Sequence, residues 1–357
     1  MQGPRKKRLL RKDMDALTCH AVDVVETAYD LEIEAADWLP RVMEAGGPAF
    51  DLGHGVVGVL GTGFTEEGQP RVGQLCTPDR SADLPLALAA ATQEVGHEAV
   101  RAVSAKSIGA VVVEKLSALR EERPEFYEAF ARKLGCKDML AVHGHDPGGR
   151  GPAFYVPSLK LLELSPAAQQ TWERIAVHIA TAHRLQRHLT GADDRAGTTI
   201  EGIPRNAEAL LDPKRFSVSH AVGAAQGRDA SKIIREAAVR IDCARGKLRK
   251  HDPAEALRIW KGMVRGRWSL VDWFDTDGRR FVLAMPNLPK LGDPRGLTER
   301  EHQVVTYASH GASSKSICYR LGISKQRVSK LLHDGMHKLG VKTPAQLVEK
   351  LRGFPRP

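Results

Sequence analysis

Signals that stop and start helices follow one another closely near the C-terminus, and they limit the possible fold more than any other feature of the chain. Gly322 is placed to end one helix, and Ser324, two residues later, is placed to cap the next. Two helices separated by so short a turn cannot pack antiparallel, so they must cross steeply. The sequence therefore predicts a helix-turn-helix in this part of the chain.

Further capping signals extend this pair to four helices. Thr298, with Glu301 three residues on, forms a capping-box pattern that starts a first helix. The second helix starts at Ser313 or Ser314, and Thr343, followed by a proline, starts a fourth. The C-terminal segment is thus predicted to be entirely helical.

The third helix has two chemically different faces. One face is apolar and is expected to be buried, and it comprises Val328, Leu332, Met336 and Leu339. The opposite face carries Gln326, Lys330, His333 and His337, with Arg327 and Ser329 on its flanks. This polar and largely basic face suits a helix that enters the major groove of DNA, where short polar and cationic groups contact base edges and phosphates. Gly335, inside the helix, is expected to cost about 1 kcal/mol relative to alanine.

The segment resembles the LuxR-type helix-turn-helix module of bacterial transcription regulators. The matching residues are Leu297-Thr298, Arg300-Glu301, Gly311, Ile317, Leu321-Gly322-Ile323-Ser324, Val328 and Lys338-Leu339-Gly340-Val341. The resemblance implies that Ser329, Lys330 and His333 face base edges, and that Ser314, Lys315, Ser324 and Arg327 lie near phosphates. With Gln326 from the polar face, these residues are the candidate DNA-binding set. The resemblance also implies double-stranded DNA as a partner, a homodimer formed through the fourth helix, and RNA polymerase as a further partner.

The distribution of charge agrees with a DNA-binding end. The chain has 53 Lys and Arg against 43 Asp and Glu, a net charge of +10. Twelve Lys and Arg but only four Asp and Glu lie in residues 295–357, and the first twelve residues hold six basic and no acidic side chains. The remainder is slightly acidic, which predicts a polyanionic partner for the C-terminal module alone. The basic start is expected to be a solvated tail, with DNA contact as the alternative.

The preceding sequence divides into two regions of mixed helix and strand. Residues 13–189 predict an early helix, paired strands at 53–64 and 71–76, helices over 84–101 and 110–133, a second hairpin, and a closing helix that starts after Ser165. This order resembles a GAF-like sensor domain. Residues 190–199 predict a linker. Residues 200–290, with two strands, helices and a closing hairpin across Asp275-Thr276-Asp277-Gly278, resemble a PAS-like domain.

The expected fold class is therefore α+β. It consists of a basic tail at 1–12, two α/β sensor-type domains, and an all-α helix-turn-helix domain over 295–357. A small-molecule ligand in the sensor domains is expected between sheet and helices. The aromatic group Trp268, Trp273, Phe274 and Phe281 is expected to be sheet core rather than a ligand cage.

The sequence gives little support for catalysis. Gly53–Gly58 matches GxGxxG but precedes a strand-like segment, and no phosphate-binding GxxxxGK[ST] occurs. His143 and His145 precede Pro147 where a metal site would need a carboxylate, and Glu94 with His97 is better explained as an exposed helix face. No catalytic residue, metal site or cofactor is therefore predicted, and the cofactor-binding residues, if any, are unknown.

Cysteine usage and hydropathy indicate the compartment. The five cysteines lie far apart and form no CxxC pair, which indicates a reducing cytosol. No stretch is apolar enough to span a membrane, so no membrane association and a cytoplasmic location are expected. The predicted function is a sequence-specific, DNA-binding transcriptional regulator that senses an unknown signal. The alternatives are a protein-interaction adaptor in signalling and a ligand-binding enzyme with a basic appendage.

Overall fold

The computed structural model describes residues 20–64, 70–78, 82–104, 111–145, 150–189, 200, 203, 206–265, 267–286, 297–339 and 341–352. The chain divides into two compact units, which are described separately: one contains residues 37–176 and the segment up to residue 27, and the other contains residues 28–36 and everything after residue 176. The predicted basic tail and the predicted linker at 190–199 lie outside the described residues. None of the helices in the described part of the chain has the length and apolar character needed to cross a membrane.

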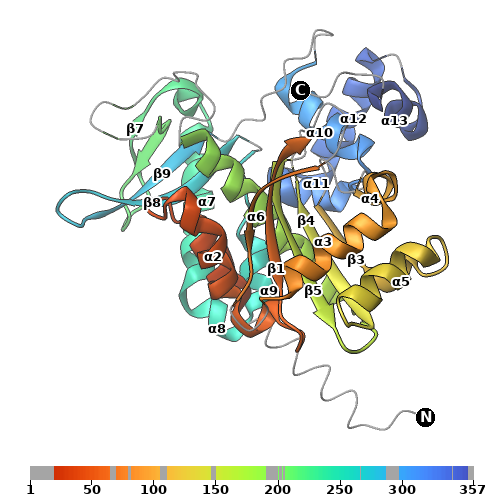
Figure 1. Cartoon of the computed structure of the whole chain (residues 1–357). Helices are drawn as coiled ribbons and strands as arrows, with labels where there is room; N and C mark the ends of the chain where they lie inside the picture. Colours follow the sequence, from red (N-terminus) through yellow and green to blue (C-terminus); the bar gives the residue numbers. More distant parts are fainter. Residues whose placement is uncertain are drawn as a thin grey trace. The chain divides into compact units, whose positions relative to one another are not determined.

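The first unit is built on a five-stranded antiparallel sheet with the order β2-β1-β5-β4-β3 (Figure 1). The strands are β1 (Val57–Phe64), β2 (Pro70–Cys76), β3 (Val111–Lys115), β4 (Asp138–Gly144) and β5 (Arg150–Ser158). The two strand pairs expected from the sequence, β1 with β2 and β4 with β5, are confirmed. Because β1 directly follows residues 53–56, the GxGxxG match lacks the helix that a dinucleotide site requires.

Two helix predictions in this unit are wrong at specific places. Residues 111–115, expected to be helical, form the edge strand β3, because three consecutive valines favour extended backbone over helix. The segment 84–104 is two helices, α3 (Leu84–Val95) and α4 (His97–Ser104), interrupted at Gly96, whose φ is +79°.

This interruption separates Glu94 from His97, so the two side chains do not share one helix face. Glu94 instead forms ion pairs with Arg132 and with Lys133 of α5 (Pro124–Lys133), the latter with an Nζ to Oε2 distance of 3.4 Å. These two ion pairs occupy the Glu94 carboxylate, so the structure gives no support for a ligand role of Glu94.

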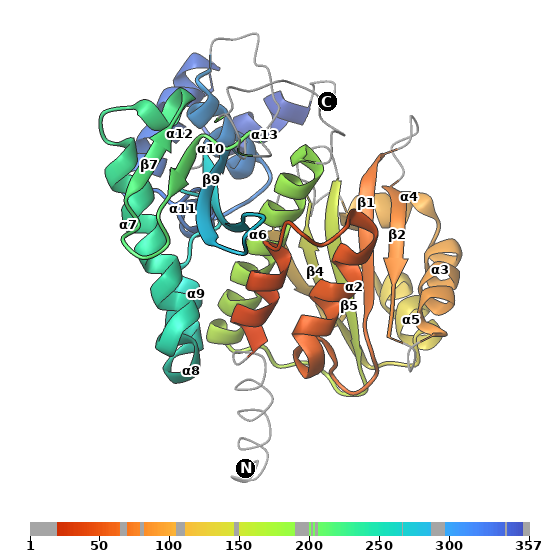
Figure 2. The ribbon, with the colours of Figure 1, turned by 90° about the vertical axis from the view of Figure 1, so that its left-hand side faces the viewer.

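Helices cover both faces of this sheet. The helices α3, α4 and α5 lie on one face, and α2 (Ala35–Gly46) with the first part of α6 (Pro166–Leu189) lies on the other (Figure 2). On the second face Phe50 stacks on Phe154 of β5 with a centroid distance of 5.0 Å. Trp172 of α6 also packs against the ring of Phe50. Ser165 accepts a hydrogen bond from the amide of Ala168, which confirms the predicted start of α6. Short 3₁₀ turns occupy Gly47–Phe50 and Leu116–Leu119.

The second unit contains a four-stranded antiparallel sheet with the order β7-β6-β9-β8. Its strands are β6 (Ala209–Leu211), β7 (Val218–Ala221), β8 (Trp268–Phe274) and β9 (Arg280–Pro286). Besides the second part of α6, its helical segments before residue 287 are η4 (Gly223–Gln226), α7 (Ala230–Cys243), η5 (Ala244–Leu248), α8 (Arg249–His251) and α9 (Pro253–Ile259). Asp252 accepts the amide hydrogen of Glu255 and so caps α9 at its N-terminus.

The aromatic group of this sheet is only partly core. Trp268 is buried, and its indole Nε1 donates to Glu208 Oε2 at 2.7 Å. Phe274, expected to be core, is 52% exposed, because it is the last residue of β8 before the turn and lies at the end of the strand. The β8–β9 hairpin itself is confirmed.

Candidate nucleic-acid interface

Four capped helices form the C-terminal module of the second unit. They are α10 (Glu299–Ser309), α11 (Ser314–Leu321), α12 (Lys325–Lys338) and α13 (Pro344–Arg352). Thr298 and Glu301 form the predicted capping box: the amide of Glu301 donates to Thr298 Oγ1, and the amide of Thr298 donates to Glu301 Oε2 at 2.8 Å. Of the two serines considered for α11, Ser313 is the cap. Thr343 caps α13 by accepting from the amide of Gln346.

The turn between α11 and α12 depends on glycine at position 322. Gly322 ends α11 with a left-handed backbone, φ +63° and ψ 33°, which residues with a Cβ adopt only with strain. A Cβ at this position would also lie 2.2 Å from the backbone oxygen of Met263, so no side chain fits. Ser324 then caps α12 by accepting from the amide of Arg327. The helix-turn-helix predicted from the sequence is therefore confirmed.

The buried face of α12 is wider than the apolar stripe expected from the sequence. Val328 and Leu339 are buried as predicted, and Leu331, which lies outside the predicted stripe, is buried as well. Leu332 and Met336 are half-buried. Gly335 faces α10, where an added Cβ would lie 2.5 Å from Val305 Cγ2. The glycine that is unfavourable for an isolated helix thus allows α10 and α12 to approach closely.

An ion pair connects the ends of these two helices. Lys338 Nζ donates to Glu301 Oε2 at 2.7 Å, and Glu301 is only 5% exposed. Burial raises the pKa of Glu301, but hydrogen bonds from Lys338 and Thr298 outweigh it and hold the pKa below its usual value. The capping carboxylate therefore stays ionised at neutral pH.

The module also packs against the preceding part of the second unit. Met263 is fully buried among the core residues of α10, α11 and α12. Tyr319 of α11 donates its hydroxyl hydrogen toward the backbone carbonyl of Leu257 and lies 2.9 Å from Nε2 of the buried His178. Lys261 Nζ lies 4.3 Å from the centre of the Tyr319 ring. The segment 257–263 is thus part of the packing of this module.

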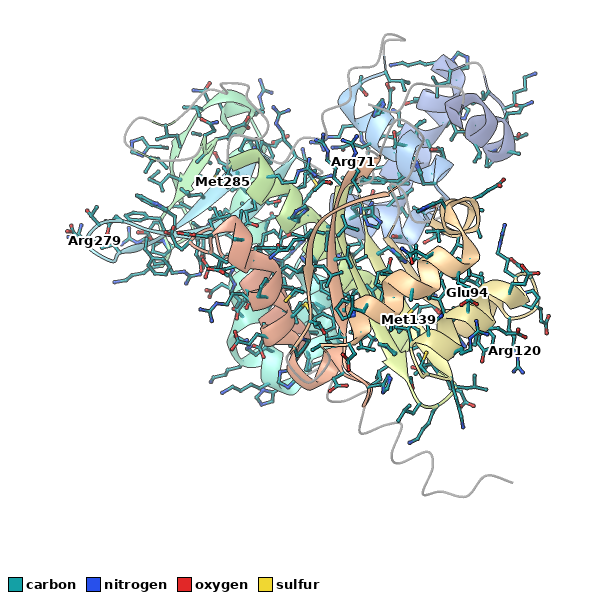
Figure 3. The ribbon with its side chains drawn as sticks, in the orientation of Figure 1. Arg71, Glu94, Arg120, Met139, Arg279 and Met285 are labelled. Atoms are coloured by element: carbon teal, nitrogen blue, oxygen red, sulfur yellow. The ribbon has the colours of Figure 1, made fainter. Side chains whose placement is uncertain are left out.

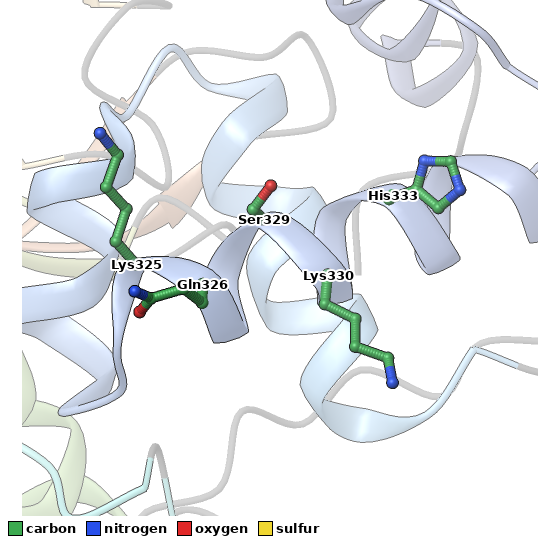
Figure 4. A pocket seen from close by; sticks show the side chains of 5 residues that line it. All are labelled: Lys325, Gln326, Ser329, Lys330 and His333. Carbon is green, nitrogen blue, oxygen red and sulfur yellow. The ribbon is translucent and has the colours of Figure 1, made fainter.

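The polar face of α12 remains exposed. We define the α12 surface as the shallow depression lined by Lys325, Gln326, Ser329, Lys330 and His333, whose side chains follow one another along the helix (Figure 4). All five are exposed, and Asp334 beside them is half-buried. Two ammonium groups, an amide, a hydroxyl and an imidazole on one helix face provide the donors and acceptors that read base edges and bind phosphates.

The structure brings four of the eight predicted site residues onto the α12 surface: Gln326, Ser329, Lys330 and His333. The other four, Ser314, Lys315, Ser324 and Arg327, are exposed but do not line it. Lys325, which the sequence-based set omitted, joins the surface because it is the first residue of α12 after the Ser324 cap. A basic side chain directly after a helix cap is the sequence signal that could have identified Lys325 as part of this surface.

A short turn between two crossing capped helices, with an exposed basic face on the second, defines the module as a helix-turn-helix of the DNA-binding class. The comparison with family models agrees: residues 295–351 match the model described as bacterial regulatory proteins, luxR family. The C-terminal module is therefore a LuxR-family helix-turn-helix domain, and it supports a DNA-binding transcription regulator. A comparison with curated proteins finds no match to this chain.

Other side chains considered for chemistry do not assemble into a site. Among the described residues, no group of three or more His, Cys, Asp or Glu side chains is arranged to hold a metal ion. His143 and His145 are neighbours, with ring centroids 5.5 Å apart, and Asp146 and Pro147 lie outside the described residues.

Proposed function

We propose that this protein is a sequence-specific transcriptional regulator that reads double-stranded DNA with the α12 surface. The observation that carries the proposal is the exposure of five polar and basic side chains along one face of α12, in a helix-turn-helix whose opposite face is buried. Ser329, Lys330 and His333 contact base edges, with Gln326 and Lys325 beside them. Ser314, Lys315, Ser324 and Arg327 contact phosphates.

The two mixed α/β regions are proposed to act as sensor domains, GAF-like over 13–189 and PAS-like over 200–290. A five-stranded antiparallel sheet with helices on both faces, and a four-stranded sheet with helices, support this role. Binding of a signal shifts the population toward an arrangement in which two modules of a homodimer meet adjacent half-sites. We further propose a cytoplasmic, non-enzymatic protein that contacts RNA polymerase, with α13 contributing to the dimer.

The test is the effect of single substitutions on DNA binding by the full chain. Genomic fragments bound by the protein are first captured and sequenced, and affinity for the strongest site and its single-base variants is then measured by fluorescence anisotropy at several salt concentrations. Lys330→Ala is expected to weaken specific binding by about 1 to 3 kcal/mol and to relax preference at one base pair. Arg327→Ala is expected to weaken binding to all sequences alike and to reduce the slope of log affinity against log salt by about 1.

Lys232→Ala and Arg240→Ala serve as matched controls, because both side chains are exposed on α7 of the same unit. Neither control should change affinity or salt slope. Equal loss on every sequence for Lys330→Ala would remove its base-reading role. Absence of salt-sensitive DNA affinity in the full chain would refute the proposed function and favour the adaptor.

A further inference from the structure

A cavity of about 410 Å³ lies in the first unit, on the face of the five-stranded sheet that α3, α4 and α5 cover. Its floor contains Met139, Ala141 and His143 of β4 with Tyr155 of β5, and Met139 is labelled in Figure 3. Positions two apart on a strand share a face, which explains why these alternating residues meet there. The volume is in the range of small-molecule binding sites.

The lining is mostly apolar, and part of it reaches the surface. Leu88 of α3 and Phe126 and Phe130 of α5 form the roof. At the β2 edge Val72 is 59% exposed and Leu75 is 43% exposed, although both are large apolar side chains. A bound apolar molecule would cover these side chains and remove their surface from water.

His143 supplies the polar group at the bottom of this apolar space. Its side chain is buried, with 9% exposure, and its Nδ1 atom has no hydrogen-bond partner among the described residues. Burial, together with the neighbouring His145, lowers the pKa of His143 to about 3, so the imidazole is neutral at pH 7. Nδ1 itself has almost no accessible surface, so a ligand hydroxyl or carbonyl would hydrogen-bond to the part of the imidazole that lines the cavity.

The ring of Tyr155 restricts the position of this imidazole. Tyr155 meets His143 edge to face with a centroid distance of 5.6 Å, and it is paired across the strands with Ala141. The small side chain of Ala141 leaves the space above the sheet open beside the two rings. An aromatic wall, a neutral imidazole and a small floor residue together suit a flat ring that carries one hydrogen-bonding group.

We propose that this cavity binds an uncharged, largely apolar and flat organic molecule whose single hydroxyl or carbonyl group hydrogen-bonds to the imidazole of His143. Although Arg71, Glu114 and Lys115 also line the cavity, a charged group beside the buried His143 is disfavoured, because the apolar side chains around it desolvate the charge. This inference rests on the proposed sensory role of the first unit, and it names the class of ligand that the unit binds. Ligand binding is measured without DNA, so failure of this proposal is distinguishable from failure of DNA binding.

The test uses the full chain and three naphthalene probes that differ only in their polar group: 2-naphthol, naphthalene and 2-naphthoate. Binding is followed by probe fluorescence at pH 7. The expected order of affinity is 2-naphthol, then naphthalene about five- to tenfold weaker, then 2-naphthoate. His143→Phe should reduce 2-naphthol binding to the level of naphthalene and leave naphthalene binding nearly unchanged.

A second variant tests the location of the site. Ala141→Phe fills the floor of the cavity and should abolish binding of both uncharged probes, whereas Ala254→Phe, at an exposed position on α9, should leave binding unchanged. Circular dichroism confirms folding of each variant. In wild-type protein labelled with ¹⁵N-histidine, the His143 resonance should shift on titration with 2-naphthol, a readout that needs no variant.

Several outcomes would overturn the proposal. They are failure of 2-naphthol to bind the wild-type chain, wild-type affinity in His143→Phe or Ala141→Phe, strongest binding of 2-naphthoate, and an unchanged His143 resonance at saturation. Any of these would mean that the space holds only water or that a different group recognises the ligand.

Discussion

Gly335 offers a sharp test of the packing between α10 and α12. In an exposed helix, replacing glycine with alanine stabilises by about 1 kcal/mol. Here the new methyl group would lie 2.5 Å from Cγ2 of Val305, a branched side chain that is 1% exposed and cannot swing away. Overpacking of this kind costs about 1 to 3 kcal/mol. Gly335→Ala should therefore destabilise the module by up to about 2 kcal/mol, the opposite sign from helix propensity.

The measurement is amide hydrogen exchange of the full chain, read from peptides that cover α10 and α12, because it reports the stability of this module separately from the rest. A double-mutant cycle gives the cause. Val305→Ala removes the atom that the new methyl group meets, so Gly335→Ala in that background should be neutral or stabilising. If Gly335→Ala slows exchange in the otherwise unaltered protein, the close approach of the two helices is wrong.

Three further predictions concern buried side chains. Met263→Ala should cost about 2 to 5 kcal/mol, because it empties part of the core of the helical module, and should speed amide exchange in α11 and α12 but not in the five-stranded sheet. Glu301→Gln should lower the stability of the module by about 1 kcal/mol at pH 7. Because the pKa of Glu301 is lowered in the folded state, the difference should vanish as pH falls through and below the usual glutamate range, which thermal melts across pH would show. His143 has a folded pKa of about 3 against the usual 6.5, so the first unit should lose about 2 kcal/mol between pH 7 and pH 5, and denaturation of His143→Phe should lack that loss.

Local signals in the sequence predict the helical module well. Caps such as Thr298 and Ser324 and the stop at Gly322 act within one turn of the chain, so they can be read without knowing the fold. The polar face of α12 was predictable for the same reason, since helical periodicity alone separates it from the apolar face. The DNA contacts assigned to these residues remain predictions.

Features that depend on distant partners could not be predicted in this way. The valines of the segment Val111 to Lys115 favour extended backbone, but the strand forms by pairing with β4, which lies more than twenty residues further along the chain. Leu331 is buried because Met263 and α10 surround it, and neither lies on its own helix. The open space beside His143 arises from five strands and three helices that pack together, so no stretch of sequence signals it.

The position of Met263 has a consequence for how such a regulator can be assembled in evolution. The family match begins at residue 295, yet one of the side chains that fills the core of the matched domain comes from more than thirty residues earlier. Transplanting the matched segment alone onto another sensor would leave a hole where this methionine sits. A functional exchange of DNA-binding modules must therefore include residues 257–263, or the recipient protein must supply an apolar side chain that fills the space of Met263.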